Sequence, residues 1–420
     1  MSRKLVLTAC VAFTLIGRAA AAQGTGASIH PAQPLTLSGA IAEALERHPE
    51  LQALRREHEA ARAAPLQERY LAPPMLETQI WGWPVTTLNP IRTDMYMFMA
   101  EQELPGRGKR AARTLVAERD ADMAERHIAV RANQILNDVT HAFLDLGLAR
   151  EVTTLYERQA PVLEDMAEAA TLRYATGQTG QHHTVTSLVE LTRLEKDRIG
   201  AVERVQTIEA RLNTLLGRPA GQLIEPLGDI ATAVNVANAE QLALERHPEL
   251  AAARALIRRE EAELGRLRGD RRPDFLVGGG YMLMPGEAGA WTARAGLTWP
   301  SAPWSRGRLT AALDVQEKRL AAVKSRRDVT ATRLRQAVRE ATVRLAAAER
   351  QVQLIDSTVL PQIEHAFELA RVAYEQGEGA FGDVLESRHL LFTMQLERAE
   401  ARANVGRARA DLAAAVGSHD

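Results

Sequence analysis

One stretch of eight residues occurs twice in this chain of 420 residues, and this repeat constrains the fold more than any other feature. Residues 44–51 and 243–250 both read ALERHPEL, 199 positions apart. Self-similarity at one long spacing is typical of a duplicated architecture. We therefore predict a first repeat over residues 36–217 and a second over 238–417. Glycine and proline gather between the repeats, so residues 218–237 are expected to be a linker.

Each repeat is expected to contain a helix, two strands and a long helical hairpin. In the first repeat the strands are predicted at 75–85 and 93–104 and the hairpin at 106–216. In the second repeat the strands are predicted at 274–284 and 290–299 and the hairpin at 305–416. Histidine and proline interrupt the first helix of each repeat, at His48 and His247, which we interpret as helix caps rather than metal ligands.

The first residues resemble a secretory signal rather than part of the fold. Arg3 and Lys4 precede an apolar run, and small residues follow it, so residues 1–22 are predicted to be a signal peptide and 23–35 an N-terminal extension. Cys10 would be acylated if it belonged to a lipoprotein box, and would otherwise be removed with the signal. No later apolar run is long enough to predict a transmembrane helix.

A long heptad pattern follows the first strand pair. Apolar or small residues recur at spacings of four and three at Ile128, Ala132, Ile135, Val139, Ala142, Leu146, Ala149, Thr153, Tyr156, Ala160 and Leu163. This spacing predicts a left-handed coiled coil, with a helix roughly 100 Å long. Pro161 and Pro361 are expected to interrupt the helices that contain them.

The strand sequences suggest contact with lipid. Trp291, Leu297 and Trp299 share one face of the fourth strand, whereas Arg294 lies on the other. An apolar face bounded by tryptophans, on strands of about ten residues, is typical of a membrane β-barrel. Four strands cannot close a barrel alone, so we expect three copies to supply twelve strands. The alternative is a soluble sheet that packs on helices.

Six of the ten methionines lie in the strand regions. The residues expected to face a lumen are Met95, Met97, Met99, Glu101, Glu103, Met282, Met284 and Arg294. Thioethers are soft ligands for Cu(I) or Ag(I), which would indicate heavy-metal efflux. The alternative is that methionine serves only as flexible apolar filling.

Other function classes find little support in the sequence. The net charge is −1, so no nucleic-acid partner is indicated. No catalytic triad, paired carboxylates, phosphate loop or metal-ligand spacing is evident, and we predict no enzymatic activity, cofactor or metal site. A periplasmic coiled-coil adaptor or scaffold without a membrane barrel is the alternative function, although it would not require strands bounded by tryptophan.

The chain resembles the TolC-like outer-membrane efflux proteins over nearly all of its length after the signal. The resemblance rests on the duplicated ALERHPEL segment, the strand-to-helix junctions 105–109 and 304–308, and the hairpin segment 374–385. It implies a mainly α fold with a small β part: a trimeric, 12-stranded outer-membrane β-barrel on a periplasmic α-helical coiled-coil barrel. The implied function is a passive export duct for small molecules or metal ions, and the heavy-metal branch of the family is one candidate.

The resemblance also implies partners and a site. A homotrimer embedded in outer-membrane lipid would extend into the periplasm of a Gram-negative cell and contact a periplasmic adaptor protein, which links it to an inner-membrane pump. The residues implied at the periplasmic mouth are Tyr174, Gly177, His183, Tyr374, Gly377, Asp383, Val384 and Leu385. His183 stands where the second repeat has Asp383, so a symmetrical acidic ring is not expected. His182 and His183 either tune opening with pH or are solvated tip residues.

Overall fold

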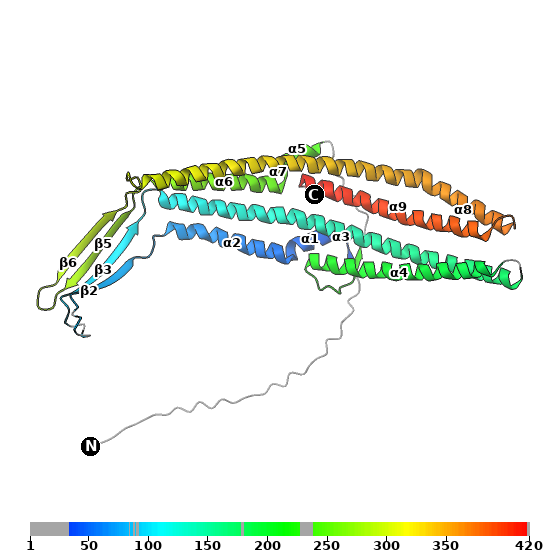
Figure 1. Ribbon diagram of the computed structural model, residues 1–420, viewed down its shortest axis with the longest axis horizontal. Coiled ribbons are helices and arrows are strands. Elements are labelled where there is room, and N and C mark those ends of the chain that lie inside the picture. Colours follow the sequence, from blue (N-terminus) through cyan, green and yellow to red (C-terminus); the bar gives the residue numbers. More distant parts are fainter. Residues whose placement is uncertain are drawn as a thin grey trace, which may run out of the picture.

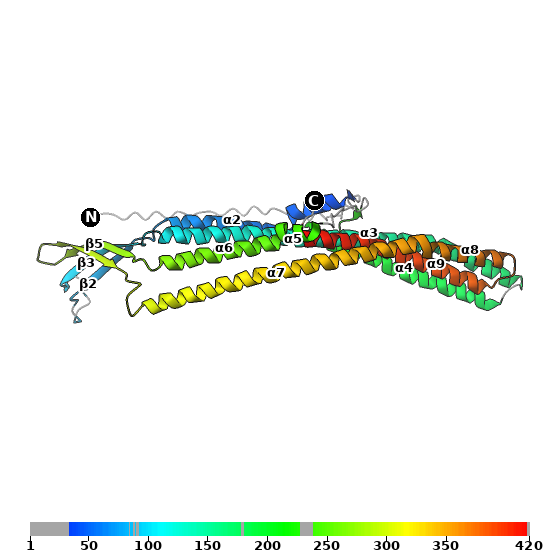
Figure 2. The ribbon, with the colours of Figure 1, turned by 90° about the horizontal axis from the view of Figure 1, so that it is seen from above.

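The chain folds into a long rod, with a sheet at one end and the turns of two helical hairpins at the other (Figures 1 and 2). The computed structural model describes residues 33–417 except 84, 87, 88, 90, 91, 178, 179 and 227–237. The predicted signal peptide, Cys10 and most of the predicted N-terminal extension lie outside the described residues. In the described part of the chain, no helix has the length and apolar character needed to cross a membrane.

Both repeats follow the same element order. The first repeat contains α1 (Leu37–Arg47), α2 (Pro49–Arg69), β2 (Met75–Trp81), β3 (Met95–Leu104), α3 (Lys109–Ala175) and α4 (Gln181–Leu216). The second contains α5 (Ala239–Arg246), α6 (Pro248–Gly269), β5 (Phe275–Leu283), β6 (Ala290–Leu297), α7 (Arg306–Leu354), a π-helical segment (Ile355–Val359), α8 (Leu360–Glu375) and α9 (Phe381–Val416). The predicted mainly α fold with a small β part is confirmed.

The histidine of each repeated segment caps a helix. The Glu50 amide donates to Nδ1 of His48 over 3.3 Å, and the Glu249 amide donates to Nδ1 of His247 over 3.2 Å. The proline that follows each histidine occupies the first helical position, where its missing N–H costs nothing. The interpretation of both histidines as caps is confirmed.

The heptad residues form the cores along the rod. Ile135, Val139, Ala142 and Leu146 of α3 have no exposed surface and pack with residues of α1, α2 and α4. In the second repeat the core is formed by Val338, Ala341 and Leu345 of α7 together with residues of α5 and α9. The alanines in both seams allow the helices to approach closely.

The two repeats differ where proline enters the long helix. Pro161 lies inside α3, which continues past it to Ala175, so the expected interruption there is wrong. Pro361 follows the π-helical Ile355–Val359, which separates α7 from α8. A π-turn widens the helix and relieves the clash of the proline ring with the preceding turn.

The four long strands form one antiparallel sheet in the order β2-β3-β5-β6, so β2 and β6 are its edges. β2 ends at Trp81, short of residue 85, because Gly82 turns the chain with a φ of 68°. β6 ends at Leu297 and not at 299, just ahead of Pro300. Neither face of this sheet is covered by a helix in Figures 1 and 2.

A short parallel strand pair lies beside the helices at the middle of the rod. β1 (Gln33–Leu35) pairs with β4 (Ile224–Pro226), and Ile224 is fully buried in the first core. These residues were expected to belong to an extension and a linker, and the pairing is not evident from the sequence. Three-residue strands carry too little pattern to be recognised in a sequence.

The junction between sheet and helices is held by an ion pair. Lys109, at the start of α3, donates from Nζ to Oδ2 of Asp274 over 2.7 Å, and the Gly106 amide donates to Oδ1 over 2.8 Å. The Lys109 side chain is 4% exposed and that of Asp274 is 17% exposed. A side chain at position 106 would collide with the Pro273 carbonyl. The segment Pro105–Lys109 therefore combines a glycine, which allows the close approach to Pro273, with a lysine, which forms the ion pair.

Replacing Lys109 by methionine is predicted to destabilise the fold by about 3 kcal/mol, because it leaves the Asp274 carboxylate buried without its cation. The change is measured as the loss in free energy of unfolding in detergent. Glu317→Gln is the matched control, since the Arg268–Glu317 pair is 61% and 58% exposed. It should cost less than about 0.5 kcal/mol. Equal costs for the two variants would contradict the proposed clamp.

Acid is predicted to weaken the α5–α6 junction through His247. Burial lowers the pKa of this imidazole below its ordinary value, with neighbouring Glu249 opposing the shift. The folded chain therefore resists protonation that the unfolded chain accepts, so stability is fully present above about pH 6.5 and falls as the pH drops below it. His247→Asn keeps a capping side chain, and its unfolding free energy should vary less between pH 7 and pH 5. His48→Asn is the control, because His48 is a less buried cap. This substitution should change the pH dependence of the unfolding free energy less than His247→Asn does.

Candidate functional site

The sheet has one almost wholly apolar face. Strand register places Leu76 and Ile80 of β2, Tyr96, Phe98 and Leu104 of β3, Phe275, Val277, Tyr281 and Leu283 of β5, and Trp291, Ala293, Ala295 and Leu297 of β6 on this face. Trp291 is 83% exposed and Leu76 is 78% exposed. Exposed side chains of this size, on a sheet that no helix covers, indicate a surface made for an apolar environment.

The opposite face carries the polar residues. The side chains on this face include Glu77, Gln79, Met95, Met97, Met99, Glu101, Glu103, Met282, Thr292 and Arg294. Arg294 of β6 donates to Oε1 of Glu101 on β3 over 2.7 Å, across the intervening strand β5. The grouping of the β3 methionines with Glu101 and Arg294 thus agrees with the strand register. Met284 lies one residue beyond the end of β5.

Two glycines of β5 make this crossing possible. Gly278 lies between Glu101 and Arg294 in the register, and a Cβ at this position would approach Cγ of Glu101 to 2.9 Å. Gly280 lies opposite Met99, whose Sδ occupies the space that a Cβ would need. Side chains of β3 can therefore lie flat across β5. The Gly278–Gly280 run was not recognised as important in the sequence, although glycine inside a strand signals a close approach.

The two helical hairpins meet at the other end of the rod. Gly177 and Gly377 end their helices with φ of 70° and 82°. Phe381, at the start of α9, is 4% exposed, and its ring centroid lies 5.4 Å from that of His183 on α4 and 5.6 Å from that of Tyr374 on α8. This aromatic cluster therefore joins the first hairpin to the second.

Other tip residues have different surroundings. The Arg173 guanidinium of α3 lies 4.1 Å from the Tyr374 ring centroid, which adds a second contact between the hairpins. Tyr174 is 45% exposed. Val384 is buried, and Asp383 lies in the first turn of α9. The structure thus brings His183 and Tyr374 together around Phe381, a residue that the sequence analysis did not select, and leaves Tyr174 apart.

The tip histidines stack on each other, with ring centroids 3.9 Å apart. Burial lowers the pKa of His183, and the neighbouring His182 lowers it further. His183 is therefore neutral over most of the physiological range. No group of three or more His, Cys, Asp or Glu side chains among the described residues could hold a metal ion.

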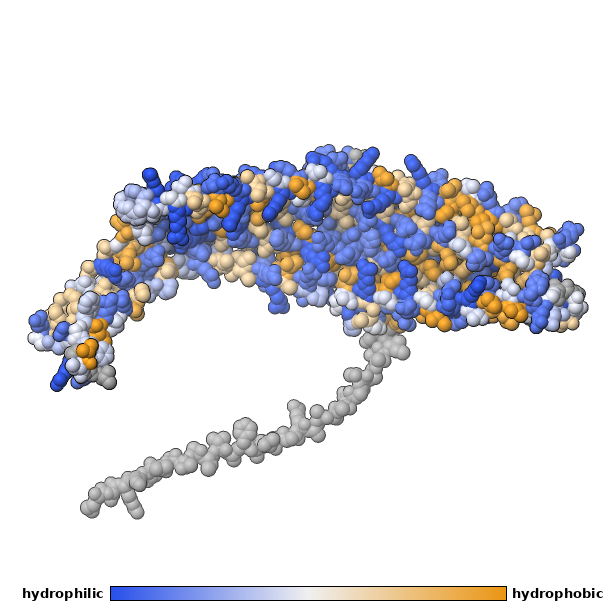
Figure 3. Space-filling model, in the orientation of Figure 1, coloured by the Kyte–Doolittle hydropathy of each residue, from blue (hydrophilic) through white to orange (hydrophobic). Residues whose placement is uncertain are grey.

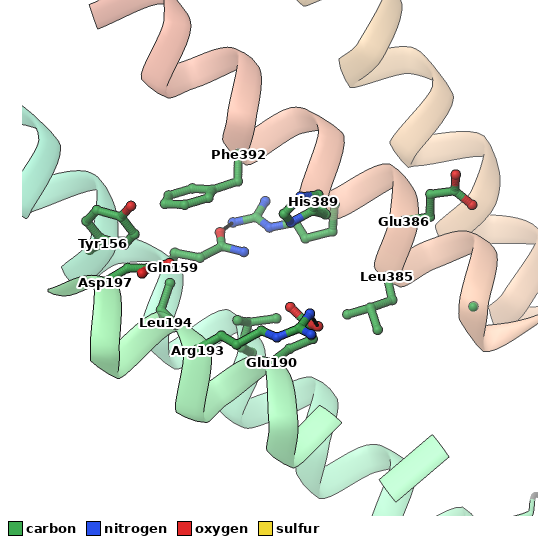
Figure 4. A pocket seen from close by; sticks show the side chains of 13 residues that line it. Tyr156, Gln159, Glu190, Arg193, Leu194, Asp197, Leu385, Glu386, His389 and Phe392 are labelled. Atoms are coloured by element: carbon green, nitrogen blue, oxygen red, sulfur yellow. Dashed lines mark hydrogen bonds and ion pairs between the residues drawn. The ribbon is translucent and has the colours of Figure 1, made fainter. Parts of the chain in front are cut away.

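A cavity of about 360 Å³ separates the hairpins behind the tip (Figure 4). Its apolar wall includes Leu163, Leu194, Leu385 and Phe392, and the Tyr156 ring meets Phe392 edge-on. Arg388 of α9 crosses the gap and donates to Oε1 of Gln159 on α3. Burial lowers the pKa of Arg388. Figure 3 shows apolar residues gathered on this helical end, over α8 and α4.

Both repeats of the chain match a known protein family. The family model described as outer membrane efflux protein matches residues 40–218 and 239–418. The cobalt-zinc-cadmium resistance protein CzcC of Cupriavidus metallidurans is 28% identical over 402 residues, which are 93% of this chain and 94% of that protein.

Solved channel structures share the fold at low sequence identity. The outer-membrane channel OprN superposes with a TM-score of 0.77 at 15% identity, over 91% of this chain and 90% of its own. CusC gives 0.77 at 16% identity, over 91% and 92% of the two chains. VceC of Vibrio cholerae gives 0.75 at 17% identity, over 91% and 96%.

A two-faced sheet at one end of a rod of paired helical hairpins defines a protomer of an outer-membrane channel. The chain belongs to the outer membrane efflux protein family, since the family model covers both repeats. It is an efflux channel of the kind that serves tripartite systems, located in the outer membrane of a Gram-negative cell and extending into the periplasm. The family consists of channels and not of enzymes, and the alternative of an adaptor or scaffold is set aside.

Proposed function

We propose that this chain forms a homotrimeric, passive duct for heavy-metal ions, without catalytic activity. The observation that carries the proposal is the four-stranded sheet with one apolar face, one polar face and two open edges. The apolar face would meet outer-membrane lipid and the polar face would line the lumen. Trp291 and Trp299, which are 83% and 60% exposed, would lie at the two levels where the barrel meets water.

Assembly of three copies follows from the edges of the sheet. The outer sides of β2 and β6 present backbone N–H and C=O groups that hydrocarbon cannot satisfy. If β6 of one protomer pairs with β2 of the next, three protomers give twelve strands, an even number that closes a channel. The helical hairpins of the three copies would then form a tube below the barrel.

The hairpin tips are the proposed mouth of this tube. They lie at the end of the rod opposite the sheet (Figure 1), and in the proposed assembly this end would be deepest in the periplasm. There the mouth residues Tyr174, Gly177, His183, Tyr374, Gly377, Asp383, Val384 and Leu385 would contact a periplasmic adaptor, which would link the channel to an inner-membrane pump. The aromatic cluster around Phe381 would hold the two hairpins of a protomer together in the narrow state.

The cargo proposal rests on two independent observations. The name of the relative CzcC states resistance to cobalt, zinc and cadmium. In this chain, thioethers and carboxylates share the polar face of the sheet, where a passing cation would meet them. We therefore propose heavy-metal cations as the exported class rather than uncharged small molecules.

Phe381→Ala is predicted to widen the mouth. Removing the ring deletes its contacts with His183 and Tyr374, which should let the hairpins separate and raise single-channel conductance in a planar bilayer severalfold. Leu369→Ala is the matched control, because Leu369 lies on α8 near the tip but is 59% exposed. A conductance of Phe381→Ala equal to that of the parent and the control would contradict the proposed role of the cluster.

Deleting the gene is predicted to lower tolerance to heavy-metal salts, because the pump would have no exit through the outer membrane. The measurement is the minimal inhibitory concentration of cobalt, zinc, cadmium, copper and silver salts beside that of several drugs. Complementation with the parent chain should restore metal tolerance. Unchanged metal tolerance with increased drug sensitivity would contradict the proposal that the cargo is a metal ion. The proposal that the chain forms an export duct would still stand.

A further inference from the structure

Three methionines converge on the polar face of the sheet. Met97 of β3 and Met282 of β5 are direct register partners, so their Cβ atoms lie about 5 Å apart. Met99 follows Met97 on the same face and is 8% exposed. The thioethers of residues at neighbouring positions on one face lie within reach of each other.

Gly280 brings the third thioether onto β5. It is the register partner of Met99, and the Met99 Sδ lies over its Cα, where any larger residue would have a side chain. Met282 follows Gly280 two residues later on the same face. The sulfur of Met99 is therefore directed toward the strand that carries Met282, and Met97 borders the same patch.

Negative charge lies beside this patch. Glu77 of β2 is the register partner of Met99. The Gln79 side chain donates a hydrogen bond to Oε1 of Glu77 over 2.7 Å. Glu101 is neutralised by Arg294, whereas Glu77 has no ion-pair partner in the part of the chain that the structure describes. The Glu77 carboxylate therefore adds a negative charge beside the clustered thioethers, which attracts a cation.

The surroundings argue against a role as apolar filling. Methionine fills gaps in cores, yet Glu77, Gln79, Glu101 and Arg294 share this face, and no helix packs against it. Most of the large aromatic and aliphatic side chains of these strands lie on the opposite face, although Trp81 and Leu276 share this one. Three thioethers on the polar side therefore require another explanation.

We propose that Met97, Met99 and Met282, with Glu77 beside them, form a binding site for a soft monovalent cation, Cu(I) or Ag(I). Neutral thioether sulfur is a soft ligand that suits such ions, whereas protein sites for Zn²⁺ are built from thiolate, imidazole and carboxylate ligands. The inference deepens the proposed function and rests on the polar face lining the duct. Three copies in a trimer would place a ring of such sites around the lumen.

The test is Ag⁺ binding by the purified full chain in detergent, measured by calorimetry at equilibrium. All proteins carry Cys10→Ser, so that the thiol does not contribute. The triple variant Met97→Leu, Met99→Leu, Met282→Leu keeps apolar volume and should lose affinity by about tenfold or more. The matched control Met123→Leu, Met166→Leu, Met394→Leu removes the same number of thioethers from helices and should bind like the parent.

The outcomes separate this inference from the proposed function. One Ag⁺ per protomer in the parent and the control, with loss in the strand variant, supports the site. Equal binding by the strand variant and the parent, or no binding by the parent, overturns it. Zn²⁺ binding should be the same in all three proteins, and its loss in the strand variant alone would contradict selectivity for soft ions. Failure of metal export itself is seen separately, in the metal tolerance of the deletion strain.

Discussion

Unpaired backbone groups at the edges of a sheet cannot remain in hydrocarbon, and this constraint governs the rest of the molecule. A single protomer offers four strands with an apolar face and leaves β2 and β6 open. The cost of each unsatisfied N–H or C=O in lipid is several kcal/mol, which no contact within the protomer can offset. The proposed association with like copies would satisfy these groups by pairing the edge strands.

Different contacts hold the two ends of the rod together. Lys109 and Asp274 connect the start of α3 to the start of β5, and Gly106 allows the two segments to approach. At the far end, Phe381 and Arg388 connect α9 to the first hairpin. The barrel end is thus fixed by a buried ion pair, whereas the tip is held by aromatic contacts beside a cavity.

Features with a long pattern could be predicted from the sequence. The heptad seam through Ile135 and Val139 repeats many times, the His48 and His247 caps are marked by the following proline, and Trp291 and Leu297 alternate with Arg294 along one strand. Each of these signals is local. The resemblance to the efflux family then implied the assembly, and the family match confirmed the family itself.

Other features depend on contacts between distant segments. Nothing in the order of residues shows that Asp274 would meet Lys109, that β1 would pair with β4, or that Arg388 would cross to Gln159. Pro161 and Pro361 look alike in sequence, yet only the second adjoins a π-turn. Such differences arise from packing between helices, and the spacing of apolar residues along the chain does not show that packing.

Native mass spectrometry of the chain released from detergent micelles shows whether like copies seal the edges of the sheet. We expect a complex of three chains, in which β6 of each protomer pairs with β2 of the next. A mass corresponding to one or two chains, from protein that keeps its strand content, would show that the edges are sealed in some other way and would contradict the account.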